Sequence, residues 1–218
     1  MVKSGFFELN LRYIFPLPAV LFVLLLMVFP VVYTLFLSFT NWSLTSGRPL
    51  QFVGFESYLR ILREPRFKAA VVRTLYFTFG AVFFQMVFGT MIALILNKEF
   101  KSKNFVKLLM MLPLVSTPVA IGIVWNLFYD PTIGFLNYVL SALNLPQSAW
   151  VSASSTVLPS LILVDIWQWT PMIALIVLAG LAAIPTEPYE SALVDGATGL
   201  QTLRHITLPM AIPTILTA

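Results

Sequence analysis

The chain has 218 residues, of which 59% are hydrophobic and only 10% are charged, whereas soluble domains carry about 25% charged residues. This composition excludes an ordinary soluble protein and indicates an integral membrane protein. The sequence contains no cysteine, so disulfides and thiolate chemistry are excluded. The formal net charge is +4, but the basic residues are scattered between apolar runs, which is typical of membrane orientation signals and not of a nucleic-acid-binding face.

The first apolar segment is predicted to be a retained transmembrane helix. Residues 13–39 form an uncharged run. A cleaved signal peptide has an apolar core of about 7 to 15 residues and a small-residue cleavage site. The run is longer than that core, and no Ala-x-Ala follows it. We therefore place the first span at residues 19–37, with a bend at Pro30.

Three further segments are long enough to cross a bilayer, which takes about 20 apolar residues as a helix. They lie within residues 74–97, 108–128 and 157–182. The predicted fold class is an all-α integral membrane protein, a polytopic helical bundle with four complete spans. Residues 210–218 have the composition of a fifth span that is cut short, so we expect a single domain over residues 1–218 that is incomplete at its C-terminus. Prolines in the later spans favour bent helices: Pro113, Pro118 and Pro171.

The loops between these spans differ in charge. Residues 41–73 are expected to be an external loop with amphipathic helices at 57–62 and 67–72, where basic side chains alternate with apolar ones. This mixture suits a helix in the membrane interface, and it suits a solvated connector with snorkelling side chains equally well. The next loop carries four lysines, typical of a cytoplasmic loop. Residues 131–156 are uncharged, and 134–140 predict a short outer helix.

A polar stretch over residues 185–209 separates the fourth span from the last segment. Thr186 is expected to cap a short helix that has two glutamates in its first turn. Gly196 supplies either a left-handed turn or a close backbone approach. Residues 200–206 predict a second helix, which Pro209 ends. Helices this short are marginal alone in water, so we expect the pair to dock on another surface.

The spacing within this stretch resembles the EAA loop of permease subunits in ATP-binding-cassette (ABC) importers. Glu190-Ser191-Ala192 is followed after three residues by Gly196 and after nine more by Ile206-Thr207-Leu208-Pro209, and only Ser191 departs from the pattern. The resemblance implies a cytoplasmic coupling helix that sits in a groove of an ATPase subunit. The implied ATPase-docking residues are Glu190, Ser191, Ala192, Asp195, Gly196, Ile206, Leu208 and Pro209. The alternative is a structured turn without a partner.

Other stretches are similar to carbohydrate-uptake permeases of this family: residues 52–58, 74–78, 93–97, 166–171 and 179–181. The resemblance implies a type I ABC importer permease fold in the cytoplasmic (inner) membrane of a prokaryote. The implied partners are a second homologous permease subunit, two cytoplasmic ATP-binding subunits, an extracytoplasmic solute-binding protein and membrane lipid, without nucleic acid. It also places the N-terminus in the cytoplasm, which the nearly even distribution of basic residues does not decide.

An acidic residue inside the fourth span marks a candidate substrate site, because such a residue is costly in lipid and usually faces a cavity or a partner. Asp165, Gln168 and Trp169 share one helix face. A carboxylate, a carboxamide and an indole together suit a polyhydroxylated ligand. Asn126 and Tyr129 of the third span would reach the same cavity if the two helices are neighbours. The alternative is a structural hydrogen bond between helices.

The sequence lacks the groups that an enzyme or an ATP-binding protein needs. It contains no Gly-x-x-x-x-Gly-Lys-Ser/Thr phosphate loop. His205 is the only histidine and has no catalytic or metal-binding companion, so we expect no enzyme activity, no metal site and no cofactor. Gln85 is predicted to form a hydrogen bond between helices. The predicted function is a carbohydrate permease subunit. Alternatives are a permease for a phosphorylated polyol or oligopeptide, a nonfunctional fragment and, remotely, an intramembrane enzyme acting on lipid-linked sugar.

Overall fold

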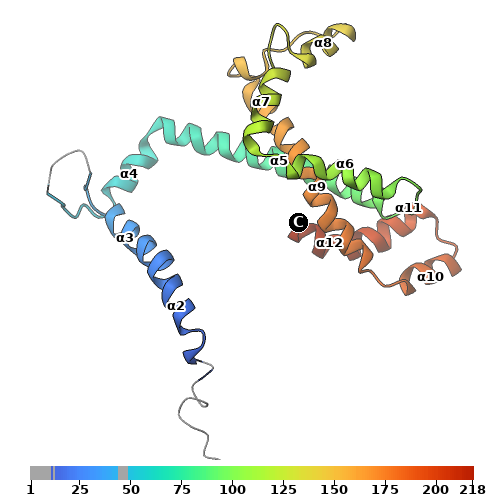
Figure 1. Cartoon of the computed structure of the whole chain (residues 1–218), viewed down its shortest axis with the longest axis horizontal. Helices are drawn as coiled ribbons and strands as arrows, with labels where there is room; N and C mark the ends of the chain where they lie inside the picture. The colour runs from blue at the N-terminus through green and yellow to red at the C-terminus, as the bar shows by residue number, and fades with distance from the viewer. Residues whose placement is uncertain (1–10, 12, 44–48) are drawn as a thin grey trace, which may run out of the picture. The chain divides into compact units, whose positions relative to one another are not determined.

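The computed structural model describes residues 11, 13–43 and 49–218, which fall into two compact units, Met1–Val71 and Val72–Ala218 (Figure 1). Regular structure in these described residues is helical, apart from an isolated antiparallel bridge between Thr40 and Phe52. The predicted all-α class is therefore confirmed.

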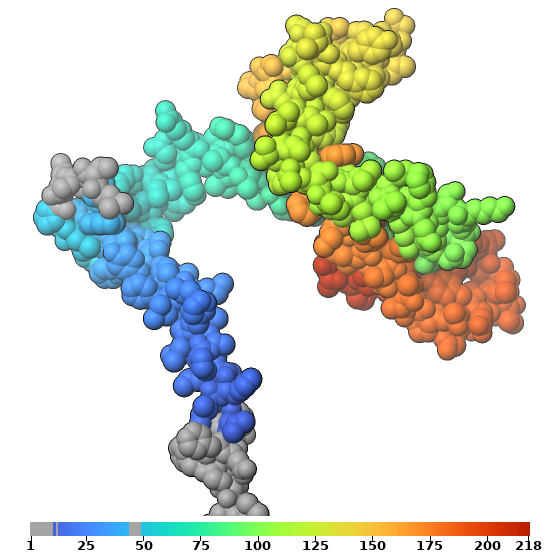
Figure 2. Space-filling model, in the orientation of Figure 1, coloured from blue at the N-terminus to red at the C-terminus, as the bar shows by residue number. Residues whose placement is uncertain are grey.

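The first span is a continuous helix of 22 residues, Leu17–Ser38. It consists of α2 (Leu17–Val23), the π-helical turn η1 (Leu24–Val28) and α3 (Phe29–Ser38). Phe29, the residue before Pro30, donates its N–H to the carbonyl of Leu24, five residues back. This wider turn lets the helix pass a proline that has no N–H of its own. The predicted span is confirmed as a helix of membrane-spanning length, and its large apolar side chains are exposed; Figure 2 draws this helix in blue.

After the first span the chain turns back on itself within the first unit. The N–H groups of Val53 and Gly54 both donate to the carbonyl of Phe39, at 2.8 and 3.0 Å. The Phe39 ring also packs against Phe55 and Tyr58, with ring centroids 5.3 and 5.5 Å apart. This aromatic cluster joins the end of α3 to the next helix.

The loop after the first span contains one separate helix, α4 (Glu56–Arg63). The second segment that we expected, 67–72, forms the first turns of the long helix α5 (Pro65–Leu96). Pro65 explains the boundary, since a proline disfavours the helical conformation of the residue before it and is well placed at the start of a helix. Glu64 accordingly has ψ of 120°.

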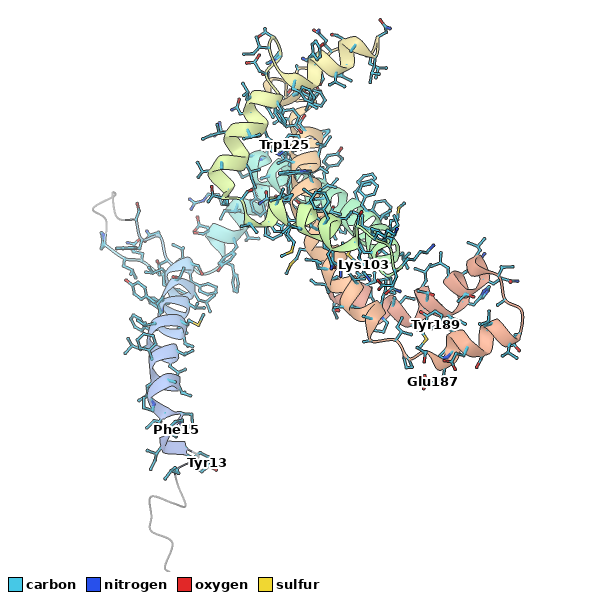
Figure 3. The ribbon with its side chains drawn as sticks, turned by 45° about the vertical axis from the view of Figure 1, so that its right-hand side comes forward. Tyr13, Phe15, Lys103, Trp125, Glu187 and Tyr189 are labelled. Atoms are coloured by element: carbon cyan, nitrogen blue, oxygen red, sulfur yellow. The ribbon has the colours of Figure 1, made fainter. Side chains whose placement is uncertain are left out.

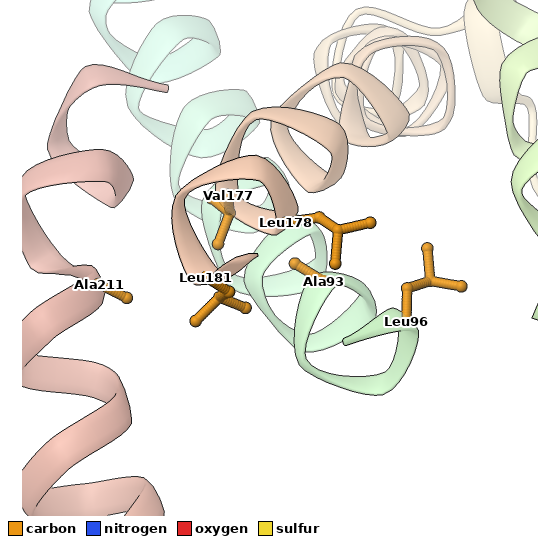
Figure 4. Close-up of a cluster of buried hydrophobic side chains, with 6 residues drawn as sticks. All are labelled: Ala93, Leu96, Val177, Leu178, Leu181 and Ala211. Atoms are coloured by element: carbon orange, nitrogen blue, oxygen red, sulfur yellow. The ribbon is translucent and has the colours of Figure 1, made fainter. Parts of the chain in front are cut away.

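The second unit packs around α9 (Val157–Ala182), whose bounds agree with the predicted fourth span. Its inner face meets α5 and α12 (Leu208–Thr217) in the buried cluster of Figure 4. Glycine permits this close approach: a Cβ on Gly89 would lie 2.6 Å from the Cγ2 of Ile173, and a Cβ on Gly180 would collide with Thr214. Small residues at helix contacts are typical of membrane bundles. The cluster consists of Ala93, Leu96, Val177, Leu178, Leu181 and Ala211.

The predicted third span is not one helix. It consists of α6 (Lys103–Val115) and α7 (Pro118–Phe128), which are bent by 97° relative to each other. Thr117 precedes Pro118 and is extended, with ψ of 141°, because a proline disfavours the helical conformation of its predecessor. The predicted segment 108–128 therefore bends sharply at Pro118, one of the prolines at which a bend was expected. The described residues contain three helices long and apolar enough to cross a membrane, or four if this bent pair forms one span.

The uncharged segment after α7 contains α8 (Phe135–Ala142), which confirms the predicted short helix, and the 3-10 turn η2 (Trp150–Ser152). The buried side chain of Asn137 holds them together. Its amide donates to the carbonyls of Pro131 and Ser148 at 3.0 and 2.9 Å, and its carbonyl accepts from the Nε1 of Trp150 at 2.8 Å. After α9 follow α10 (Glu187–Val194), α11 (Gly199–Thr202), the π turn η3 (Leu203–Thr207) and α12.

Candidate functional site: the coupling loop and the α9 faces

The segment predicted to be the coupling loop, residues 185–209 and called the coupling loop below, begins with α10, which has Pro188 and two glutamates in its first turn. Proline and carboxylates are both favourable at this end of a helix. Thr186 occupies the N-cap position, but its hydroxyl makes no capping bond, so that prediction is wrong. A capping side chain usually needs an extended backbone, whereas Thr186 has φ −79° and ψ −24°. Its carbonyl instead accepts the N–H groups of Tyr189 and Glu190, at 2.9 and 3.0 Å.

The end of α10 depends on Gly196. This residue has φ of +70°, a conformation that costs a side-chain-bearing residue about 1–2 kcal/mol. The N–H of Ala197 donates to the carbonyl of Ala192 at 2.9 Å, and that of Gly196 donates to Leu193 at 3.2 Å. This pair of bonds is a Schellman motif. A Cβ on Gly196 would meet no atom within 4 Å, so the glycine serves the left-handed turn and not a close approach.

The second helix of the loop begins at a capping box, in which the N–H of Thr198 donates to Gln201 Oε1 at 2.7 Å. It then continues from α11 through η3 into α12, so the prediction that Pro209 ends it is wrong. Leu208 donates its N–H to the carbonyl of Leu203, five residues back. The same wider turn precedes Pro30 in the first span, and it carries both helices past a proline.

The predicted docking residues divide into an inner and an outer set. Ala192 is buried, and Ile206 and Leu208 are half-buried, so these three hold the helices of the loop together. The outer set is exposed and consists of Glu190, Ser191, Asp195, Gly196 and Pro209. A cavity of about 440 Å³ lies between the two arms of the loop. The outer set is exposed, and Ala192 and Ile206 of the inner set line this cavity.

The predicted substrate face of α9 is joined to α5. The Nε2 of Gln85 donates to the Oδ2 of Asp165 at 2.7 Å and to its backbone oxygen at 3.2 Å. The prediction that Gln85 forms a hydrogen bond between helices is confirmed, and Asp165 is its partner. On the same face Gln168 is half-buried and Trp169 is exposed. In this conformation Asp165 therefore takes part in the structural bond that was the alternative to ligand binding.

The predicted residues of α7 meet the opposite side of α9. Tyr129 is buried, and its hydroxyl donates to the carbonyl of Ser160 at 2.7 Å. Trp125, labelled in Figure 3, packs edge-on against Trp167 with centroids 5.5 Å apart. Ser160 and Trp167 are seven residues apart and share a face, whereas residues two apart, such as Asp165 and Trp167, do not. The helices are thus neighbours, but Tyr129 does not reach the Asp165 face.

Asn126 completes the predicted set. It lies on α7 and is exposed. In the described part of the chain its side chain forms no hydrogen bond, so its polar groups are open to a ligand or to water. The five predicted substrate residues are accordingly not brought together, since Asn126 is exposed on α7. Asp165, Gln168 and Trp169 lie on one face of α9, and Tyr129 lies with Trp125 on the other.

Residues 85–218, which include both the α9 faces and the coupling loop, match the family described as "Binding-protein-dependent transport system inner membrane component". The chain belongs to this family of inner-membrane permease components. Membership of a transport family confirms the expectation of a permease and not an enzyme. It also agrees with the helices of membrane-spanning length described above.

Full-length comparisons extend the similarity of this permease over its first unit. It is 38% identical over 205 residues to a probable ABC transporter permease, y4oQ, of Sinorhizobium fredii, covering 94% of this chain and 66% of that protein. It is 31% identical to the trehalose/maltose transport system permease MalF of Thermococcus litoralis, covering 99% of this chain and 73% of that protein. The chain thus spans about two thirds to three quarters of these relatives.

A solved structure shares the fold of the permease. The chain matches a subunit of a bacterial alginate ABC transporter, crystallised with an alginate pentasaccharide-bound periplasmic protein, with a TM-score of 0.81 and 24% identity. The match covers 96% of this chain and 70% of that subunit. The similarity to an ABC importer permease fold, predicted from the coupling motif, is therefore confirmed.

Three exposed apolar residues of the permease's coupling loop were not predicted from the sequence. Leu193, Val194 and Leu200 are 79%, 88% and 74% exposed. Leu193 and Leu200 line a cavity of about 750 Å³ together with Tyr189 of α10, which Figure 3 labels, and Lys98 at the end of α5. The signal was present in the sequence, because an apolar residue in a segment outside the bilayer has neither a span nor a core to explain it.

A second feature that the sequence did not reveal lies between α5, α6 and α9 of the permease. A cavity of about 440 Å³ is bordered by Pro113 of α6 and Pro171 of α9. Thr170 is one of its lining residues, and the buried hydroxyl of Thr170 has no hydrogen-bond partner among the described residues. Because a proline lacks the N–H that would bond four residues back, both helices have a weakened hydrogen-bond ladder at this cavity.

Proposed function

We propose that this chain is the transmembrane permease subunit of an ATP-binding-cassette importer of carbohydrate, and that residues 185–209 couple it to cytoplasmic ATPase subunits. Membership of a binding-protein-dependent transport family supports import. A carbohydrate is supported by relatives named for trehalose/maltose and, at 29% identity over 88% of this chain, for glucose import in Saccharolobus solfataricus.

The coupling loop carries the proposal. Its turn and its second helix are held by a Schellman motif and a capping box, so its backbone is well defined. Yet Leu193, Val194 and Leu200 extend into solvent, where each loses the benefit of burial, about 1.5–3 kcal/mol for a fully buried aliphatic side chain. A rigid surface with exposed apolar side chains suits a protein partner. An ATPase subunit is that partner in this proposal.

The same region supports a cytoplasmic location of the coupling loop. Lys98 belongs to the lysine-rich loop between α5 and α6, and it lines the same cavity as Leu193 and Leu200. The lysine loop and the coupling loop therefore lie at one end of the second unit. Since lysines are enriched in cytoplasmic loops, this arrangement supports a cytoplasmic coupling loop and an N-terminus on the same side.

The remaining partners complete the importer. A second homologous permease subunit would face the exposed sides of α5 and α9, an extracytoplasmic solute-binding protein would deliver the sugar, and two ATPase subunits would supply the energy. ATP binding would move the coupling loop as a rigid body, and the spans would reorganise around a site near the middle of the bilayer. The helices α6 and α9 have weakened hydrogen-bond ladders at Pro113 and Pro171, and these are suitable places for such a movement.

We place the sugar on the Asp165 face of α9. Trp169 supplies a flat ring for the C–H face of a sugar, and Gln168 supplies a donor and an acceptor for hydroxyls. Asp165 would contribute after exchanging its bond with Gln85, and Asn126 would contribute from α7. Tyr129 holds α7 against α9 and acts on the sugar only if this contact opens.

Removing the apolar surface of the loop tests the coupling. The variant Leu193→Asp should copurify with at least about tenfold less ATPase subunit than the wild type, because a buried charge without a partner costs more than about 1.4 kcal/mol. The matched control is Leu143→Asp, which changes a residue 63% exposed near α8, away from the coupling loop. Equal ATPase recovery with both variants would reject the assigned role of the loop.

Uptake of labelled sugar, in competition with polyols and oligopeptides, tests the substrate class.

A further inference from the structure

The end of the first span carries a cavity that neither coupling nor sugar transport explains. It has a volume of about 560 Å³ and lies within the first unit, between the last turn of α3, residues 40–43 and the first turns of α4. Its lining combines an arginine and hydroxyl groups with apolar and aromatic side chains. The lining residues that matter here are Leu37, Ser38, Trp42, Ser57, Arg60 and Ile61.

This cavity lies where the chain leaves the membrane. Ser38 is the last residue of the 22-residue span, and its Oγ lies 2.5 Å from the hydroxyl of Tyr58 in α4. The rings of Phe39 and Phe55 surround Tyr58, with centroids 5.5 and 5.9 Å from it. Clusters of aromatic side chains are typical of the membrane–water interface. The hydrogen bond and the ring contacts therefore keep α4 at the level of the lipid headgroups.

The two faces of α4 differ in polarity, as do the two sides of the membrane–water interface. Arg60 and Arg63, three residues apart, share one face. Tyr58 and Leu62, four residues apart, share the opposite face, and Leu62 is 56% exposed. A helix with a basic face and an exposed apolar face is suited to lie in the plane of the interface.

The basic side chains of this region form no ion pair with any described residue. The ion pair found in the described residues joins Lys103 and Glu99 in the second unit. Within the first unit's described residues, Arg60, Arg63, Arg66 and Lys68 form no ion pair. An arginine at the edge of a cavity, without a carboxylate partner, is well suited to a phosphate group, which it binds through two parallel hydrogen bonds.

We propose that this cavity binds the headgroup of an anionic phospholipid. Arg60 would bind the phosphate, the hydroxyl of Ser57 would donate to it, and Trp42 would lie beside the glycerol region. One acyl chain would follow Leu37 and the exposed surface of α3 into the bilayer. A lipid fits better than a free phosphate or an acidic protein, because the cavity pairs the arginine with apolar residues at the end of an uncovered span.

Native mass spectrometry of the full chain tests this assignment. The protein, purified in detergent, is exposed to equal amounts of phosphatidylglycerol and phosphatidylcholine, and the lipids that remain bound are counted. The wild type should retain phosphatidylglycerol preferentially. Arg60→Gln should weaken that retention about fivefold, the effect of one basic residue at an anionic membrane surface. Arg60→Lys keeps the charge but not the paired hydrogen bonds, so it should show an intermediate loss.

The matched control is Arg73→Gln, which removes the same charge from a residue that does not line the cavity. It should retain phosphatidylglycerol like the wild type, and unchanged thermal unfolding of all variants excludes misfolding as the cause. Equal retention of the two lipids, or equal losses in the variants of Arg60 and Arg73, would overturn the proposal. Displacement of the lipid by inorganic phosphate would assign the site to soluble phosphates. Unchanged lipid retention with weaker capture of the solute-binding protein would assign it to a protein.

Discussion

The coupling loop and the candidate sugar site differ in how their residues come together. In the loop, residues close in sequence form the whole structure: Gly196 closes α10 and Thr198 opens the next helix. The candidate sugar residues instead depend on which helices are neighbours and on how each helix is rotated. The loop forms as a unit, whereas the five sugar residues do not: three lie on one face of α9, Tyr129 meets another face, and Asn126 is exposed on α7. Residues close in sequence thus form the turn and the second helix of the loop, whereas spacing does not show which faces of distant helices meet.

The largest effect is expected when the local geometry of the loop is broken. Gly196→Val places a β-branched residue at φ +70° and should destabilise the turn by at least about 1–2 kcal/mol. ATPase copurification should then fall by about tenfold. Gly199→Val is the matched control, since Gly199 lies in the same loop, has no left-handed φ and has open space around it. If both variants retain the ATPase equally, the left-handed turn does not shape the docking surface.

A smaller effect is expected at the contact between α5 and α9. A double-mutant cycle with Gln85→Leu and Asp165→Leu should give a coupling of about 0.6–1.7 kcal/mol in thermal stability, the range for hydrogen bonds between membrane helices. This result would support a structural role for the hydrogen bond between Gln85 and Asp165. The ligand interpretation of Asp165 would be favoured instead if the cycle gave no coupling and Asp165→Asn alone reduced sugar uptake.

The smallest effect concerns Asp130, in the turn after α7. Three hydrogen bonds lower the pKa of its carboxyl, from the N–H of Ile133, then from the hydroxyl and the N–H of Thr132. Because the folded pKa is lowered, the stabilisation is fully present above the pKa of the unfolded chain and is lost as pH falls through the folded value. The NMR shift of the Ile133 amide should therefore titrate at lower pH than in a peptide of residues 128–135. Identical midpoints would mean that these bonds do not hold the turn.

Much of the fold followed from hydropathy and proline positions. The length of α9 and the first span were predictable, because about 20 apolar residues have few other stable states in a membrane. Bends were expected at three prolines, but the sequence did not show that Pro118 would break its helix while Pro113 and Pro171 lie inside unbroken ones. A proline after a π turn, as at Pro209, preserves a helix, and only the backbone conformation distinguishes these outcomes.

The candidate sites, like the fold, were only partly predictable from the sequence. The docking motif was recognisable from spacing, yet Leu193, Val194 and Leu200 were missed because apolar residues in a membrane protein attract no notice until their exposure is known. The bond between Gln85 and Asp165 joins residues 80 apart in sequence. Each residue was predicted to be important in its own span, but nothing in either segment indicated the other as its partner.

Above all, we propose that the coupling loop is the surface that binds an ATPase subunit. The absence of native cysteine makes a direct test simple, since Leu193→Cys gives a single attachment point for a short photocrosslinker. In membranes that contain the assembled transporter, this variant should crosslink to the ATPase subunit, whereas Leu143→Cys should not. A Leu193 crosslink only to lipid or to the second permease, with a folded and active transporter, would contradict the claim.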